Sequence, residues 1–227
     1  MNILAIDTST QNLSLAIAKD EQILAYRNED LGRKMSNAIV PRIERLLTQV
    51  KIKPAEIDGF VVGLGPGSFT SLRVGLSTIK GLAFVGNKPI VGIPSLDAVA
   101  RSIKKSEHPV CVVADAKRSL VYTSCYTVSD DKITRTSEYV LTDIVSFLDQ
   151  LSTPVIFIGD AVALYEKEIK KSKKAIQMIT DSKQVLPQAK YFIHEGFRRL
   201  KAGKIDSMAK IVPLYLYKED CQVQAKS

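Results

Sequence analysis

Two short segments near the start of the chain combine groups that could hold a phosphate. Asp7, Thr8 and Ser9 follow the apolar residues 3–6, so a carboxylate, two hydroxyls and free backbone amides meet in one turn at the end of a predicted strand. Such a turn can bind a nucleotide phosphate and its Mg²⁺. It can also be a polar turn in which Asp7 only accepts backbone hydrogen bonds.

The second segment is a glycine-rich turn between a predicted strand and a predicted helix. Gly65 and Gly67 allow close approach to the backbone, and the helix after Ser68 points unpaired N–H groups towards an anion. The segment lacks the lysine of a Walker A loop and the spacing of GxGxxG. Ser68 or Thr70 could instead cap the helix. Arg73 could pair with the same anion or with a neighbouring carboxylate.

Histidine and cysteine chemistry is not predicted. His108 and His194 are the only histidines and form no HxxxH or HxxH pair, so we expect no metal centre. Cys111, Cys125 and Cys221 lack CxxC spacing, which predicts no disulfide framework and favours a reducing, cytoplasmic compartment. The N-terminus has neither a basic region nor a long apolar run, so no signal peptide or membrane span is expected.

Composition indicates a globular protein with aliphatic cores. The 227 residues are 45% hydrophobic and 25% charged but only 7% aromatic, without tryptophan. The net charge of +8 would suit a nucleic-acid partner if it were clustered. Residues 1–110 and 111–227 each carry +4, however, and the densest basic run, residues 167–174, is interleaved with Glu166 and Glu168 on a predicted helix end. The sequence therefore predicts no basic module.

The apolar pattern of the first half predicts three strands, a helix, a strand, a helix and a strand. The strands are expected at residues 3–6, 13–17, 23–26, 59–63 and 89–93, and the helices at residues 36–50 and 72–85. This order is that of an RNase H-like half, in which helices cover a mixed sheet. Ser36 or Asn37 could cap the first helix.

A weaker copy of this plan follows. Residues 110–114 end at Asp115 as the first strand ends at Asp7, and residues 155–158 end at Gly159 and Asp160. The other elements are expected as strands at residues 121–126 and 137–141, helices at residues 143–151 and 187–202, and an extended segment at residues 212–217. We predict an α/β protein of two RNase H-like, actin-like lobes, residues 1–106 and 107–227, whose C-terminal helix returns towards the first lobe.

The two predicted helices of the first half each carry an apolar stripe. Both stripes could cover the sheet, or together they could exceed what one small sheet needs and leave a face for a partner. Gly75 and Gly81 lower helix propensity by about 1 kcal/mol each relative to alanine. We therefore expect something to pack closely against both glycines.

Three motifs together resemble a known family. Residues 3–10 (ILAIDTST), 65–75 (GPGSFTSLRVG) and 93–98 (IPSLDA) are similar to the TsaB family of bacterial tRNA threonylcarbamoyladenosine biosynthesis proteins, and GPGSFT is the most specific of them. Weaker likenesses lie at residues 115–118, 158–161 and 213–216.

The resemblance implies a non-catalytic subunit with an actin-like fold. In that family it binds the catalytic paralogue TsaD and works beside the ATPase TsaE. The complex transfers a threonylcarbamoyl group to N6 of the adenosine next to the anticodon, in tRNAs that read codons starting with A. The chain would need no cofactor of its own, because ATP and Mg²⁺ belong to the partners, although a nucleotide could sit at the shared interface. It would meet tRNA only through the complex.

The resemblance also implies the docking face. In this family the partner binds the two helices of the first lobe, and the free chain could form a homodimer through them. The expected interface residues are Met35, Ile39, Ile43, Leu46, Leu72, Gly75, Leu76, Ile79 and Ala83. Three positions depart from the family pattern, with Met35 in place of histidine, Ser71 in place of glycine and Tyr217 in place of arginine.

Other function classes remain open at the level of sequence. A small actin-like ATP-dependent phosphotransferase would use Asp7 and residues 65–68. The older glycoprotease name of the family suggests a metallopeptidase, and a module that binds tRNA directly is a further class.

Overall fold

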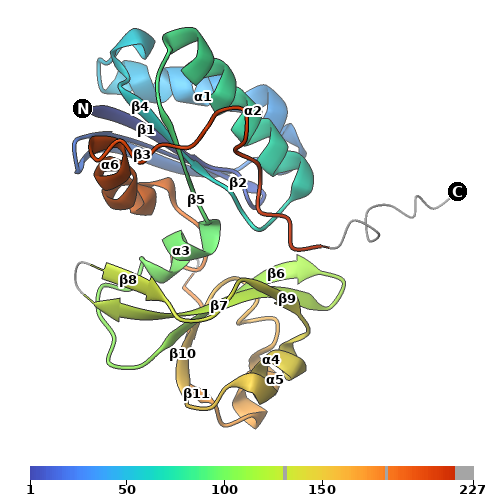
Figure 1. The fold of residues 1–227 in the computed structure, drawn as a ribbon. Coiled ribbons are helices and arrows are strands. Elements are labelled where there is room, and N and C mark those ends of the chain that lie inside the picture. Colours follow the sequence, from blue (N-terminus) through green and yellow to red (C-terminus); the bar gives the residue numbers. More distant parts are fainter. Residues whose placement is uncertain (130–131, 182–183, 218–227) are drawn as a thin grey trace, which may run out of the picture. The chain divides into compact units, whose positions relative to one another are not determined.

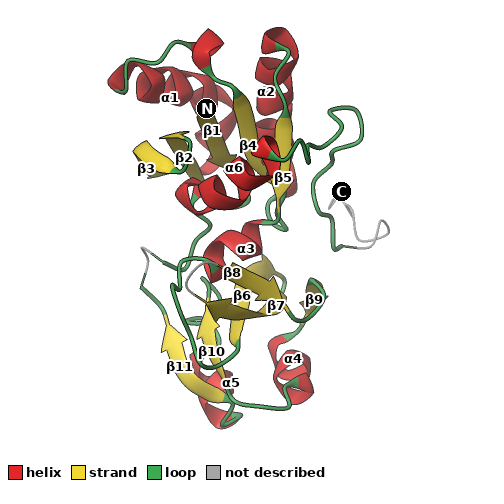
Figure 2. Ribbon diagram, turned by 60° about the vertical axis from the view of Figure 1, so that its left-hand side comes forward, coloured by secondary structure: helices red, strands yellow, loops and turns green. Residues whose placement is uncertain are grey.

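The chain forms two compact units (Figures 1 and 2), in a computed structural model that describes residues 1–129, 132–181 and 184–217. Unit 1 consists of Met1–Val99 and Pro187–Pro213. Unit 2 consists of Ala100–Leu186 and, among the described residues, 214–217. The chain thus enters unit 1 twice, which differs from the two contiguous lobes, 1–106 and 107–227, that the sequence predicted.

The sheet of unit 1 has the predicted mixed topology. Its order is β3-β2-β1-β4-β5, antiparallel from β3 to β1 and parallel from β1 to β5. The strands are β1 (Asn2–Asp7), β2 (Asn12–Lys19), β3 (Gln22–Asp30), β4 (Gly59–Gly63) and β5 (Ile90–Ile93). Parallel pairing brings the carboxyl ends of β1, β4 and β5 to one edge, where the turns after Asp7 and Gly63 meet.

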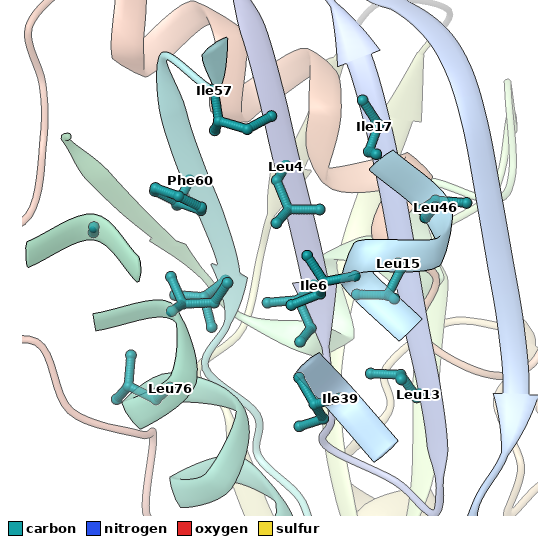
Figure 3. Packing of buried hydrophobic residues seen from close by; sticks show 14 of the residues in the cluster. Leu4, Ile6, Leu13, Leu15, Ile17, Ile39, Leu46, Ile57, Phe60 and Leu76 are labelled. Atoms are coloured by element: carbon teal, nitrogen blue, oxygen red, sulfur yellow. The ribbon is translucent and has the colours of Figure 1, made fainter. Parts of the chain in front are cut away.

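Helices cover both faces of this sheet. Because side chains alternate along a strand, Leu4 and Ile6 face one layer while Ile3 and Ala5 face the other. The first layer is α1 (Met35–Gln49) and α2 (Phe69–Gly86), and Figure 3 shows its residues Ile39, Leu46 and Leu76 beside the sheet. Two short 3₁₀ helices, Gly32–Lys34 and Pro54–Glu56, complete these connections.

The apolar stripes of α1 and α2 both pack against the sheet of unit 1. All nine residues predicted for the partner interface are buried in unit 1. A stripe that packs on its own sheet offers little surface to a partner in the folded chain. The assignment of these side chains to the partner interface stays a prediction.

The glycines and caps of these helices are partly as predicted. A Cβ at Gly75 would overlap Thr8 Oγ1, so close packing is confirmed there, whereas no atom lies within 4 Å of a Cβ at Gly81. Ser68 caps α2 by accepting a hydrogen bond from Ser71 N–H at 3.4 Å. The predicted caps of α1 are wrong, because Lys34 is the residue that precedes this helix.

The opposite face of the sheet is covered by the returning segment. Its elements are the 3₁₀ helix η3 (Ala189–Phe192) and α6 (Ile193–Lys201). Phe192, Ile193 and Leu200 pack on the face that contains Ile3 and Val61. This packing is the physical reason why the predicted lobe boundaries differ from the observed units. Residues 212–217, predicted to be extended, form no strand.

Unit 2 repeats the strand order of unit 1. Its sheet runs β11-β10-β6-β7-β8, with β9 also paired to β7. The strands are β6 (Val110–Lys117), β7 (Leu120–Ser129), β8 (Lys132–Arg135), β9 (Val140–Thr142), β10 (Val155–Ile158) and β11 (Ala175–Ile179). Helices α4 (Ile144–Gln150) and α5 (Glu166–Lys171) contribute Phe147, Leu148 and Ile169 to its core. Strands β8 and β11, and α3 (Ser95–Ala100) after β5, were not predicted.

Two of the three cysteines are joined, contrary to the prediction. Cys111 on β6 and Cys125 on β7 stand directly opposite in the antiparallel register, with Cα atoms 4.2 Å apart, and form a disulfide. They are 14 positions apart in the sequence, so only the hairpin register reveals the pair. Cys221 lies outside the described residues.

Candidate functional site

Asp7 lies at the centre of the predicted phosphate site, and its carboxylate is fully engaged. The side chain is at the end of β1 and only 1% exposed. One carboxylate oxygen accepts hydrogen bonds from Ser9 N–H at 2.9 Å and from Ser9 Oγ at 2.7 Å. The other oxygen accepts one from Ser95 Oγ at 2.5 Å. The structure therefore realises the polar turn that the sequence left as one of two interpretations.

Ser95 is the residue of this site that the sequence did not single out. Besides donating to Asp7, its hydroxyl accepts a hydrogen bond from Gly65 N–H at 3.0 Å, and its own N–H donates to the Gly65 carbonyl at 2.7 Å. Ser95 lies just after β5, as Asp7 lies at the end of β1 and Gly65 just after β4. Its position could have identified it, because it follows a predicted strand that lies parallel to the strands ending near Asp7 and Gly65.

The glycine turn packs directly on the Asp-Thr-Ser turn. A Cβ at Gly67 would overlap the Ser9 carbonyl oxygen, and that oxygen accepts a hydrogen bond from Ser68 N–H at 2.7 Å. Gly65 has φ +86°, a conformation that favours glycine. Both glycines thus permit contact with the chain itself, in the place where the sequence expected an anion.

Thr8 connects the same turn to helix α2. Its hydroxyl donates to the Ser71 carbonyl at 2.8 Å and lies against Gly75. Arg73 is on the exposed side of that helix, where its guanidinium carbon is 3.8 Å from the centroid of the Phe69 ring. Six of the seven predicted anion-site residues therefore come together, and Arg73 stacks on a neighbouring ring.

The electrostatics of this cluster are those of a closed turn. Burial raises the pKa of the Asp7 carboxyl, and the hydrogen bonds from Ser95 and Ser9 oppose that rise in part. With three donors on its oxygens and glycine backbone against Ser9, the cluster fixes the start of α2 relative to β1 and β5. Its chemistry, as the structure presents it, is positioning by hydrogen bonds.

The related edge of unit 2 is built differently. Asp160, after β10, accepts a hydrogen bond from Asp115 N–H at 2.9 Å, and burial raises the pKa of the Asp160 carboxyl. Asp115 accepts hydrogen bonds from the backbone N–H and the ammonium of Lys117. Both units have an Asp at the end of the first strand of their sheet. In unit 1 the bridging carboxylate is that of Asp7, at the end of β1, whereas in unit 2 it is that of Asp160, after β10.

The described part of the chain contains neither a metal-binding cluster nor a membrane-spanning helix. No three His, Cys, Asp or Glu side chains gather in a way that could hold a metal ion. No helix there has both the length and the apolar character needed to cross a membrane.

Comparison with known proteins identifies the family. The model described as "TsaD: tRNA N6-adenosine threonylcarbamoyltransferase" matches residues 29–220. The tRNA threonylcarbamoyladenosine biosynthesis protein TsaB of Bacillus subtilis is 29% identical over 172 residues, which are 74% of this chain and 75% of the relative. TsaB of Escherichia coli is 28% identical over 222 residues, 95% of this chain and 94% of the relative.

Solved structures confirm the actin-like fold. YeaZ from Pseudomonas aeruginosa matches with a TM-score of 0.80 at 20% identity, covering 95% of this chain and 99% of its own. The activator of the 2-hydroxyisocaproyl-CoA dehydratase from Clostridium difficile, which has ADPNP bound, matches with a TM-score of 0.51 at 11% identity, covering 90% and 97%. At these identities the two structures speak for the fold alone. Since the family model spans most of the chain and the TsaB relatives align along its length, the chain belongs to the TsaD family of tRNA N6-adenosine threonylcarbamoyltransferases, in its TsaB branch.

Proposed function

We propose that this chain is a non-catalytic subunit of the complex that makes threonylcarbamoyladenosine next to the anticodon of tRNAs reading codons that start with A. It acts in the cytoplasm by binding a catalytic TsaD-type paralogue, and a TsaE-type ATPase is the second partner. ATP and Mg²⁺ are used by the partner subunits, and any nucleotide near this chain sits at the shared interface. Its TsaB relatives are named for this pathway.

The closed turn around Asp7 supports a role without phosphate chemistry. A carboxylate that binds Mg²⁺ must offer an oxygen to the ion. Both Asp7 oxygens instead accept hydrogen bonds from Ser9 and Ser95, and Gly67 fills the space beside Ser9. The hydrogen bonds from Ser68 N–H to the Ser9 carbonyl and from Thr8 to the Ser71 carbonyl attach the start of α2 to this turn, which suits a helix that serves as a docking platform.

The observation that carries the proposal is the exposed apolar end of α2. Phe84 is 76% exposed and Val85 is 87% exposed, about one turn beyond the open position at Gly81. Phe69 at the start of the helix and Val40 on α1 are exposed as well. A contiguous exposed apolar patch on a helix is a feature of protein–protein contacts. We define Phe84, Val85 and Gly81 as the α2 docking face.

Co-elution with the TsaD-type paralogue tests this assignment. Phe84→Asp and Val85→Asp together should weaken the complex by roughly 3–6 kcal/mol, from about 1.5–3 kcal/mol for each apolar side chain that is buried on binding. Size-exclusion chromatography and calorimetric titration measure the loss. Ile79→Asp cannot serve this purpose, because Ile79 is buried under the helix and its replacement unfolds the unit.

Leu164→Asp on unit 2 is the matched control, since Leu164 is also an exposed apolar residue. It should leave the complex intact. An α2 double variant that unfolds like the parent yet binds the paralogue with unchanged affinity would exclude this face. Threonylcarbamoyl transfer or ATP hydrolysis by the chain alone would contradict the non-catalytic role.

A further inference from the structure

The positive charge of the chain is concentrated on unit 1. Pro187–Pro213 carries six Lys or Arg and two Asp or Glu, a net charge of +4, and Met1–Val99 adds eleven basic and nine acidic residues, a net charge of +2. Unit 1 thus has +6 of the total of +8. Division of the sequence at residue 110 hid this asymmetry, because the returning segment belongs to the first unit.

Part of the returning segment's positive charge lies on the side of α6 that faces away from the sheet. Ile193, Gly196 and Leu200 form the buried side of this helix. Positions that repeat every three or four residues share one face of a helix. His194, Arg198 and Lys201 follow that spacing on α6, while Lys190 precedes the helix in η3 and Lys204 lies just beyond its end.

Aromatic rings alternate with these basic side chains. Lys190 Nζ lies 4.5 Å from the ring centroid of Tyr26 on β3 and 5.0 Å from that of Tyr191. Lys201 Nζ lies 5.5 Å from the ring centroid of Phe197. Tyr26 is 52% exposed, although it is a large ring on a strand at the sheet edge. Rings and ammonium groups are therefore presented together on one surface.

Two carboxylates beside α6 are paired with residues of this helix. Glu21 is 3.2 Å from His194 Nδ1, and Glu195 forms a two-bond pair with Arg198. Among the residues that the structure describes, Lys190, Lys201 and Lys204 take part in no ion pair. The surface consequently keeps a net positive charge at neutral pH.

We infer that this surface, defined by Tyr26, Lys190, Phe197, Lys201 and Lys204, binds unpaired RNA directly. The three ammonium groups neutralise phosphates, and the exposed ring of Tyr26 offers a face on which a base stacks. An acidic peptide would use the cations but leave the rings idle, so the alternation favours RNA. The inference rests on the proposed function in one respect, since the adenosine next to the anticodon lies in an unpaired RNA loop.

Fluorescence anisotropy with a labelled RNA hairpin that has an unpaired loop tests the inference on the full chain. Lys190→Glu with Lys201→Glu should weaken binding at least tenfold and make the salt dependence shallower, by a slope of about 0.7 for each single-strand phosphate that the variant no longer neutralises. Tyr26→Leu removes the ring without changing the charge and should weaken binding about fivefold or more, while the salt slope stays the same.

Lys167→Glu with Lys171→Glu on α5 is the control, because it makes the same charge change on exposed residues of unit 2. It should leave the affinity for RNA within about twofold of the parent. If binding were only nonspecific attraction, this control would lower the affinity as much as Lys190→Glu with Lys201→Glu does. Equal loss in both pairs, or displacement of the RNA by polyglutamate at equal charge concentration, would overturn the inference. Co-elution of each variant with the TsaD-type paralogue keeps the outcomes separate, since complex formation without an effect on RNA binding refutes this surface and leaves the proposed function standing.

Discussion

Two glycines of helix α2 differ in what surrounds them, which permits a matched test at the scale of single residues. A Cβ at Gly75 would meet Thr8 Oγ1, whose hydrogen bond to Ser71 fixes it in place, so Gly75→Ala should lower the free energy of unfolding by about 1–3 kcal/mol. Gly81→Ala meets no atom and should raise it by up to about 1 kcal/mol. Urea denaturation measures both, and two changes of the same sign would contradict the packing around Thr8.

The buried carboxylate of Asp7 predicts a pH dependence. Because burial raises its pKa above 3.8, the folded chain keeps the proton at pH values where the unfolded chain has lost it. The contribution of Asp7 to stability therefore falls as pH rises from about 4 through its folded pKa. The unfolding free energy of the parent minus that of Asp7→Asn should therefore decrease as the pH rises above about 4. Asp160, whose pKa is also raised, is present in both proteins and cancels. A difference that grows with pH would show that the hydrogen bonds outweigh burial.

At the scale of elements, the attachment of the returning segment to the sheet edge makes a further prediction. Arg199 donates to the Gly92 carbonyl at 2.8 Å and to Asp206 at 2.9 Å, and Asp206 accepts from Gly92 N–H at 2.7 Å. Arg199→Met should lower the free energy of unfolding by about 1.5–3 kcal/mol, because it removes hydrogen bonds to a charged, half-buried partner. In a double-mutant cycle with Asp206→Asn the two effects should be far from additive. Additive effects would mean that the pair contributes little to holding the segment.

The elements also show what could be read from the sequence. Strands with continuous apolar runs, such as Gly59–Gly63 and Val155–Ile158, were predicted to the residue. The edge strands Lys132–Arg135 and Ala175–Ile179 were missed. The first lacks an apolar run, and in the second Gln177 interrupts the apolar residues directly after a lysine-rich helix end. The sequence identified the residues of the two turns that were predicted to bind phosphate. The part played by Ser95 and the closure of the turn depend on contacts between strand ends that are distant in sequence.

At the scale of the whole molecule, the order of elements predicted the fold, while the membership of each unit depended on tertiary contacts. The helix at residues 187–202 was expected, and its return towards the first lobe was inferred, but its charge was counted with the wrong half. The buried side of this helix consists of Ile193, Gly196 and Leu200, and so short an apolar pattern does not show which of the two sheets the helix covers. Which segments belong to each unit also decides which fragments of the chain can fold.

A fragment of residues 1–106 should therefore fail to fold, although the sequence predicted it as a complete lobe. It lacks Phe192, Ile193 and Leu200, which cover the sheet face of Ile3 and Val61, and each buried apolar side chain contributes about 1.5–3 kcal/mol. Losses of this size approach the roughly 5–15 kcal/mol that stabilises a whole domain. Residues 1–99 joined by a long Gly-Ser linker to residues 187–213 restore that cover and should unfold cooperatively in urea. A cooperative transition for the 1–106 fragment would show that α1 and α2 suffice as a cover for this sheet, and the returning segment would then be dispensable for the fold of unit 1.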